Sequence, residues 1–347
     1  MTVLAVSAFA RSKGQGVFSF LDLTYNARAS ALGGTSIAIR DQDISLATTN
    51  PSLLNPTMKN QLALSIVDYF AGITYGQMVY GGKMGKSAAW SAGINYVNYG
   101  RFDETTAAGD FTGAQFHASD YAMHIAFAKP LNTLSGLGLP VRFDSLFHVG
   151  VNSTFIYSQL ADYTASGLAL DAAITYYNSK AQRTVTLLAR NAGLQLKAYT
   201  PGVHEALPFQ VQLGYAQKLK KAPLRILATW QHVEHFKLLT DSISTGVIGT
   251  AADQVSGPSM FDQALAHVAI GTEILISKNF NIRFGYNLQR RKELGVDTRM
   301  SITGLSFGLG FRVSKFQFSY GRAAYHLAGP SNTFSVSMNL QELMHRK

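Results

Sequence analysis

Residues 279–340 alternate large apolar side chains with small or polar ones. The clearest copy of this pattern runs through Phe280, Asn281, Ile282, Arg283, Phe284 and Gly285. A period of two is typical of a β-strand, because successive side chains point to opposite faces of the sheet. The pattern recurs three times before residue 340. The segment therefore predicts four consecutive strands, each with one apolar face.

The composition of the second face decides between two classes of β protein. In a soluble sandwich the apolar face is the core, and the other face carries many charges toward water. Here the second face consists mostly of Gly, Ser, Asn, Gln and Thr. Such residues suit the lumen of a wide barrel whose apolar side faces lipid. We therefore favour a membrane barrel over a soluble all-β protein.

The composition of the whole chain agrees with a membrane location. Only 14% of the 347 residues are charged, whereas soluble domains average about 25%. No stretch after residue 10 supplies the roughly 20 apolar residues that a spanning helix requires. Since lipid tolerates only helices and closed barrels, the chain predicts a barrel.

The sequence argues against two kinds of site, those that require cysteine and those that bind nucleic acid. Cysteine is absent, so neither disulfides nor thiolate metal sites contribute. The net charge of +10 suggests an anionic partner, but the basic residues form no single patch and no nucleic-acid module is present. We therefore expect no nucleic-acid binding.

Alternation and turn signals after residue 59 predict fourteen antiparallel strands, an all-β transmembrane barrel. The expected strands are 60–69, 73–82, 87–99, 119–128, 143–157, 166–178, 181–191, 207–217, 223–233, 262–275, 279–290, 302–313, 315–323 and 332–340.

The predicted connections alternate between short and long. The longest are 100–119, 191–206 and 234–261. Outer-membrane barrels have short periplasmic turns and long extracellular loops. An even number of strands then places both termini in the periplasm, with 341–347 as a periplasmic tail.

The first 58 residues differ from the barrel. Residues 1–14 are interpreted as a signal-peptide remnant and linker, because a short apolar run ends in a small-x-small pattern. Residues 15–58 contain a Gly pair, Gly33 and Gly34, and X-Pro turns such as Asn50 with Pro51. Such punctuation predicts compact irregular structure. We expect it to form a plug in the lumen of a barrel that spans 59–340.

Few residues suggest chemistry. His232 and His235 flank Val and Glu, which is not a zinc-protease spacing, and Ser153 and His148 would face opposite sides of one strand. We therefore expect no catalytic residue, no metal and no cofactor, and hence no enzyme. The loop 234–261 is either surface decoration or a partner-docking loop, for which the candidate residues are Glu234, His235, Asp241 and Asp253.

Lysines recur in the predicted short turns. Examples are Lys83, Lys218 and Lys278. They could form a basic rim for an acidic partner, or they could simply keep the turns solvated. We favour the second interpretation.

The N-terminal segment resembles a known family. The stretches 17–23, 27–34 and 50–54 are similar to the opening of the PorQ family of outer-membrane barrels in type IX secretion. That family is related to PorV and, more distantly, to FadL-type fatty acid transporters. The Gly-Gly and Asn-Pro elements are shared among FadL-like barrels, whereas the Phe-x-Phe-Leu at 18–21 points to PorQ.

The resemblance implies a scaffold. PorQ-like proteins anchor PorZ at the cell surface, within the attachment complex of PorU and PorV that joins secreted cargo to lipopolysaccharide. The barrel would contact outer-membrane lipid or lipopolysaccharide, and the chemistry would belong to PorU. The alternative is a FadL-like conduit for hydrophobic small molecules, in which the plug gates a path through the lumen. The small polar lumen face favours the scaffold.

Overall fold

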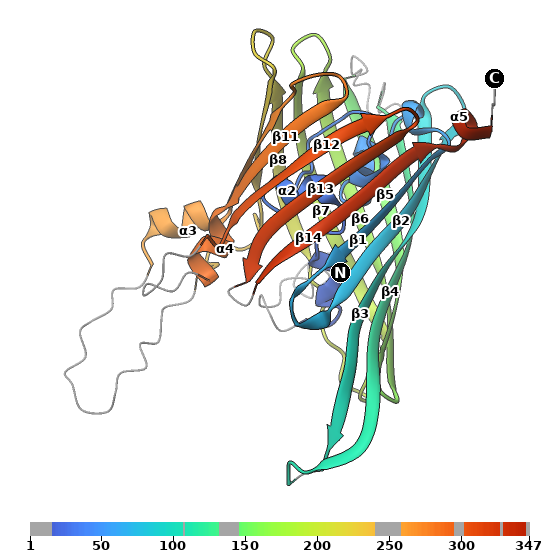
Figure 1. The fold of residues 1–347 in the computed structure, drawn as a ribbon, viewed down its shortest axis with the longest axis vertical. Helices are drawn as coiled ribbons and strands as arrows, with labels where there is room; N and C mark the ends of the chain where they lie inside the picture. The colour runs from blue at the N-terminus through green and yellow to red at the C-terminus, as the bar shows by residue number, and fades with distance from the viewer. Residues whose placement is uncertain are drawn as a thin grey trace, which may run out of the picture.

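Fourteen antiparallel strands close into a barrel in the computed structural model (Figure 1). The structure describes residues 16–106, 108–131, 146–239, 258–294, 302–326 and 329–344. Each strand pairs with its neighbours in sequence, and the first strand pairs with the last. The predicted fold class and strand number are confirmed.

The strands have the following bounds: β1 Gln61–Asp68, β2 Thr74–Met84, β3 Ala88–Thr105, β4 Phe111–Pro130, β5 Phe147–Leu160, β6 Tyr163–Asn178, β7 Arg183–Lys197, β8 Gln210–Lys218, β9 Leu224–Trp230, β10 Val268–Ile274, β11 Phe280–Asn287, β12 Leu305–Val313, β13 Phe316–His326 and β14 Gly329–Asn339.

The apolar faces of the strands point outward. On neighbouring strands, Phe284 and Phe307 are about half exposed, at 51% and 50%, whereas Arg283 and Ser306 are buried. A soluble sandwich would show the reverse arrangement, because its large apolar side chains form the core. The outward apolar band and inward polar face are those of a barrel embedded in lipid.

The closing pair of strands leaves no free edge. β1 is paired with β14 along its whole length, from Gln61 opposite Asn339 to Asp68 opposite Asn332. Unpaired strand edges expose backbone groups that lipid cannot satisfy. Closure is therefore a requirement of the membrane and not only of packing.

The predicted loop 100–119 is wrong in part. β3 and β4 continue to Thr105 and from Phe111, and they form a hairpin that projects beyond the other strands (Figure 1). Phe102 and Phe116 stack across it, with ring centroids 5.3 Å apart. The extension was missed because its residues are mixed in polarity, so they lack the lipid-facing alternation on which strand prediction depends.

Two predicted strand ends are short helices instead. α3 (Met260–Ala266) precedes β10, and α4 (Leu288–Leu294) follows β11. Ser259 and Asp262 form a capping box at the start of α3, which satisfies backbone N–H groups that have no partner within the helix. The predicted strands 262–275 and 279–290 are therefore too long at one end each.

The two ends of the described chain lie at opposite ends of the barrel. The last helix, α5 (Leu340–Met344), lies beside the short turns, where the Leu340 N–H donates to the carbonyl of Asn60 at 2.8 Å (Figure 1). The Val17 N–H instead donates to the carbonyl of Ala206, in the long link after β7. The predicted signal-peptide remnant, 1–14, lies outside the described residues.

No helix in the described part of the chain is long and apolar enough to span a membrane. The longest helices there, α3 and α4, have seven residues each.

Residues 16–58 pack inside the barrel (Figure 1), and we call this segment the plug. It consists of short helices joined by turns. These are the 3-10 helices η1 (Ser19–Asp22), η2 (Ile44–Thr48), η3 (Pro51–Leu53) and η4 (Pro56–Met58), and the α-helix α2 (Ala27–Ala31). A further 3-10 turn, η5 (Phe70–Gly72), joins β1 to β2.

Candidate functional site

Asn50 and Pro51 hold the shape of the plug. The side-chain oxygen of Asn50 accepts from the Ser52 N–H at 3.0 Å, and its amide nitrogen donates to the carbonyl of Ile37 at 2.6 Å. Proline fixes the backbone angle of the first helical position, where no N–H is needed. The Asn-Pro pair therefore caps η3 and ties it to another part of the plug.

Gly33 and Gly34 end α2 and fix it to the barrel wall. Both have positive φ angles, 89° and 88°, which residues with a side chain rarely adopt. The Gly34 N–H donates to the carbonyl of Ala29 at 2.9 Å. The Gly33 N–H donates to Ser306 Oγ at 3.0 Å, and the Gly33 carbonyl accepts from Asn287 Nδ2 at 2.9 Å.

Glycines in the wall allow α2 to approach the strands. A Cβ at Gly285 would lie 2.1 Å from the Gly33 nitrogen, and one at Gly321 would lie 2.3 Å from the Ala27 carbonyl oxygen. Real side chains do not tolerate such distances to backbone atoms. The small residues on the lumen face therefore serve the contact with the plug, whereas from the sequence alone they are interpreted only as the lining of a wide lumen.

Arg28, the second residue of α2, joins the plug to the barrel. Its Nε donates to Glu273 Oε1 on β10 at 2.7 Å. Its other nitrogens reach Asp41 at 2.7 Å and Asp43 at 3.2 Å, both within the plug. One guanidinium thus binds three carboxylates, two of them from the segment that it belongs to.

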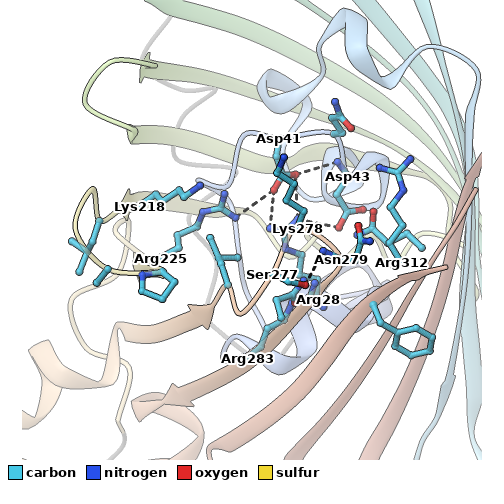
Figure 2. Close-up of a pocket in the computed structure, with 18 of the residues that line it drawn as sticks. Arg28, Asp41, Asp43, Lys218, Arg225, Ser277, Lys278, Asn279, Arg283 and Arg312 are labelled. Atoms are coloured by element: carbon cyan, nitrogen blue, oxygen red, sulfur yellow. Dashed lines mark hydrogen bonds and ion pairs between the residues drawn. The ribbon is translucent and has the colours of Figure 1, made fainter. Parts of the chain in front are cut away.

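Glu273 is the centre of this cluster on the barrel side. Its carboxylate also accepts from Arg225 Nη1 at 2.5 Å and from Arg283 Nε at 3.1 Å. Arg225 in turn lies 3.4 Å from Asp41 (Figure 2). We call the six residues Arg28, Asp41, Asp43, Arg225, Glu273 and Arg283 the ionic cluster.

The ionic cluster is balanced and buried. Three guanidiniums face three carboxylates, and the side chain of Glu273 has no exposed surface. Burial raises the pKa of Asp41, but Arg28 and Arg225 outweigh burial and hold this pKa below its ordinary value. Every member therefore keeps a charged partner at neutral pH, as buried charges require.

A cavity of about 440 Å³ lies at the other end of the plug, toward the long loops. Its walls are mostly apolar and come from the plug, β3, β4, β5 and the link after β7. The lining side chains include Val17, Phe18, Tyr99, Phe102, Phe116, Leu160 and Tyr199. We call it the outer cavity.

One wall of the outer cavity is polar. Asp120 on β4 accepts a hydrogen bond from the Tyr99 hydroxyl at 2.6 Å and a second one from the Ser158 hydroxyl. The hydroxyls of Ser158 and Tyr199 are also hydrogen-bonded to each other. The carboxylate of Asp120, like that of Glu205, thus lines a mostly apolar space rich in aromatic rings, which suits an uncharged apolar molecule that carries a hydrogen-bond donor.

The aromatic core of the plug lies directly below the outer cavity. Phe20 and Tyr25 pack there against Tyr75 and Val97 of the barrel wall, and the rings of Tyr25 and Tyr75 are 5.2 Å apart. Since Val17 and Phe18 line the cavity while Arg28 reaches the opposite end, the plug separates the two ends of the lumen.

The predicted docking loop, 234–261, is described only at its two ends, 234–239 and 258–261. Glu234 points inward, where its carboxylate accepts from the Val211 N–H at 2.7 Å and lies 3.2 Å from His232 Nδ1. His235 is half-buried. Asp241 and Asp253 lie outside the described residues, so the docking role of this loop stays a prediction.

Sequence reasoning missed the ionic cluster and the outer cavity. A signal was present for the cluster, because Arg283 and Glu273 are charges on the lumen face of strands otherwise lined by small residues. For Asp120 the signal was weaker, since a single acidic residue in an alternating strand is also compatible with the rim of a barrel.

No protein-family model and no curated protein matches the sequence. Solved structures do match. The toluene transporter TbuX of Ralstonia pickettii superposes with a TM-score of 0.54 at 13% identity, over 93% of this chain and 100% of that one.

A second match is a deltaS2 mutant of the monoaromatic hydrocarbon channel TodX. It gives a TM-score of 0.51 at 14% identity, over 91% of this chain and 97% of that one. A FadL homologue of Pseudomonas aeruginosa is less similar, with a TM-score of 0.48 at 11% identity, over 94% of this chain and 100% of that one. The fold is therefore the one shared by the TbuX and TodX barrels.

Proposed function

We propose that this protein is an outer-membrane transporter that binds hydrophobic small molecules in the outer cavity and passes them beyond the plug. The observation that carries the proposal is an aromatic cavity of about 440 Å³ whose walls include the first residues of the plug. Small-molecule sites are commonly roughly 300–1,000 Å³, mostly apolar, with a few placed polar groups. The hydrocarbon transporter and channel with the same fold support this proposal.

The polar wall defines the class of ligand. Asp120 would repel an anion, and its remaining lone pairs can accept from a ligand hydroxyl. The aromatic side chains favour a ring or a short alkyl chain. An alkylphenol should therefore bind more tightly than a benzoate of the same size, and this order distinguishes the site from one for fatty acids.

The test is calorimetric titration of the purified barrel with 4-propylphenol and 4-propylbenzoate. Ser19 is exposed and lines the outer cavity, so Ser19→Trp should fill the space without removing a packed side chain. Ser179, an exposed residue in the short turn between β6 and β7, gives the matched control Ser179→Trp. We expect 4-propylphenol binding to be lost in the first variant only.

Equal binding of the phenol and the benzoate, or equal binding by both Trp variants, would contradict a site in the outer cavity. The phenol would then be dissolving in the detergent or in the apolar outer band of the barrel. Uptake into proteoliposomes, compared between wild type and Ser19→Trp, extends the test from binding to transport.

A surface scaffold is the second candidate, and the β3–β4 hairpin favours it. Phe111 at its tip is 75% exposed, and on α3 Met260 and Phe261 are 77% and 71% exposed. Large exposed apolar side chains outside the lipid are typical of partner-binding surfaces. In this proposal PorZ, together with PorU and PorV, binds the long-loop end.

Mild cross-linking in intact cells, followed by mass spectrometry of the purified barrel, tests the scaffold. Recovery of PorZ with wild type but not with a variant whose hairpin tip, 103–115, is replaced by a two-residue Asn-Gly turn would support it. A barrel that carries only lipid or lipopolysaccharide in both preparations would exclude it. The two functions are compatible, since the hairpin tip and the core of the plug are different parts of the chain.

A further inference from the structure

A second, larger cavity of about 860 Å³ opens at the short-turn end of the lumen (Figure 2). The turn between β8 and β9, the turn between β10 and β11, the end of β12 and the plug form its walls. The two turns and the end of β12 follow one another around the barrel. We call this space the inner cavity.

The inner cavity contains two groups of charges. The Arg28, Arg225, Arg283, Asp41 and Asp43 side chains at its floor belong to the ionic cluster, which is neutral once Glu273 is included. The second group has only cations. It consists of Lys218, Lys220, Lys221, Lys278 and Arg312.

The five cations of the second group lack compensating charges. Within the described ranges, no carboxylate forms an ion pair with any of them, whereas the arginines at the floor of the cavity are all paired. Lys218 is half-buried and the other four are exposed, but all five line one cavity, so their fields add there. Positive charges gathered in this way repel one another unless an anion lies between them.

The neutral residues of the wall can also serve an anion. Ser277, Asn279 and Asn281 line the same cavity and carry hydroxyl and amide groups that donate hydrogen bonds. Lys218 and Arg312 continue the lumen-facing register of Ala216 and Gly310. The donors therefore come from three neighbouring elements and face one space.

We propose that the inner cavity binds a small multivalent anion that bears phosphate groups. Lysine and arginine are the preferred partners of phosphate oxygens, and Arg312 can bind two oxygens at once. The ligand must carry several phosphate groups, because the cations are spread over two turns and a strand. The ligand must be compact, because the neutral ionic cluster and the plug close the floor of the cavity.

The test is calorimetric titration of the barrel, in neutral detergent and at about 0.1 M salt, with tripolyphosphate as the probe. The variant Lys220→Ala, Lys221→Ala, Lys278→Ala removes three charges from the cavity. The control Lys83→Ala, Lys86→Ala, Lys180→Ala removes three exposed lysines at the same end, one from the end of β2 and two from turns outside the cavity. None of these six residues touches the outer cavity.

We expect one tripolyphosphate per barrel, and affinity lowered at least about tenfold in the cavity variant, since each charge-assisted contact contributes on the order of 1.5 kcal/mol or more. The control should change affinity by less than about threefold, because exposed distant charges are screened over about 10 Å at 0.1 M salt. Equal losses in both variants, or no binding by wild type, would overturn the proposal.

Two sources of phosphate are distinguished by the lipid around the barrel. In nanodiscs of phosphatidylglycerol, a lipid headgroup that occupies the cavity should weaken tripolyphosphate binding relative to phosphatidylcholine nanodiscs. Equal affinity in both lipids indicates a soluble ligand. The Ser19→Trp variant should leave this binding unchanged, so failure here is distinguishable from failure of the proposed transport function.

Discussion

The two ends of the plug are held by different forces. Near the short turns, Arg28 binds Glu273 and Asp41 through hydrogen bonds between charged groups. Near the long loops, Phe18 and Tyr25 pack against the wall through apolar contacts. Charge-assisted bonds depend on geometry, whereas apolar contacts are non-directional and can repack. The plug is therefore fixed at its inner end, and rearrangement for a ligand should begin at its outer end.

Removal of the central carboxylate should have the largest effect. Glu273→Gln leaves three buried guanidiniums with only Asp41 and Asp43 as anions, and loss of one partner from a buried ion pair costs about 3–5 kcal/mol. We expect a corresponding loss in the free energy of unfolding, measured by urea titration of the barrel. Glu205→Gln, at an exposed residue of the outer cavity, is the control and should stay within about 0.5 kcal/mol. Similar losses of unfolding free energy in both variants would show that the ionic cluster does not specially stabilise the inner end of the plug.

Disruption of the contact between α2 and the barrel wall should have the second-largest effect. Gly285→Ala places a Cβ 2.1 Å from a plug backbone nitrogen, whereas Gly271→Ala places one 3.1 Å from the flexible side chain of Leu32. Overpacking costs typically about 1–3 kcal/mol, and we expect only the first variant to reach that range. Trypsin cleavage within the plug, which contains Arg28 and Arg40, should accelerate in the same variant. Equal losses of stability and equal trypsin cleavage in the two variants would indicate that the plug does not depend on the close contact between α2 and the wall.

A change at the outer end should cost less. Tyr99→Phe removes one hydrogen bond to Asp120, which keeps its bond from Ser158. The expected loss of unfolding free energy is about 1 kcal/mol. Tyr163→Phe, at an exposed tyrosine, is the matched control. A loss as large as that of Glu273→Gln would remove the distinction between the two ends.

The smallest effect should depend on pH. Arg28 and Arg225 hold the pKa of Asp41 below its ordinary value near 3.8. A lowered pKa in the folded state gives stabilisation that is complete above the ordinary value and disappears as pH falls through the lowered one. Asp41→Asn should therefore be less stable than wild type from pH 5 to 7, by about 1 kcal/mol or less. The difference should shrink only as pH falls below about 3.8 toward the lowered pKa of Asp41, and a difference that stays constant down through that pKa would contradict the assignment.

The sequence predicts the strands of the barrel better than the contacts of the plug inside it. Alternation along a strand such as β12 is a local property imposed by lipid, so strand number and face direction could be read directly. The plug contacts are non-local, because Arg28 meets Glu273 across 245 positions of the chain, and no spacing rule connects them.

Glycine was the residue most easily misinterpreted. From the sequence alone, glycines such as Gly285 and Gly321 are interpreted as the lining of a wide lumen, yet they allow a helix to lie against the strands. The same composition serves both purposes, so only the position of the plug decides between them. The short helices α3 and α4 were missed because seven residues give too little periodicity to detect.

The place of α2 on the wall also constrains how the protein is made. The Ala27 N–H donates to Ser335 Oγ on β14 at 3.0 Å, so the two groups are separated by 308 positions. Loop closure over that distance costs about 5 kcal/mol of chain entropy. The N-terminal segment, synthesised first, cannot reach its final position until the last strands arrive. Closure of the barrel and insertion of the plug are therefore late and coupled events. A barrel that lacks β13 and β14 would leave the plug without its binding surface.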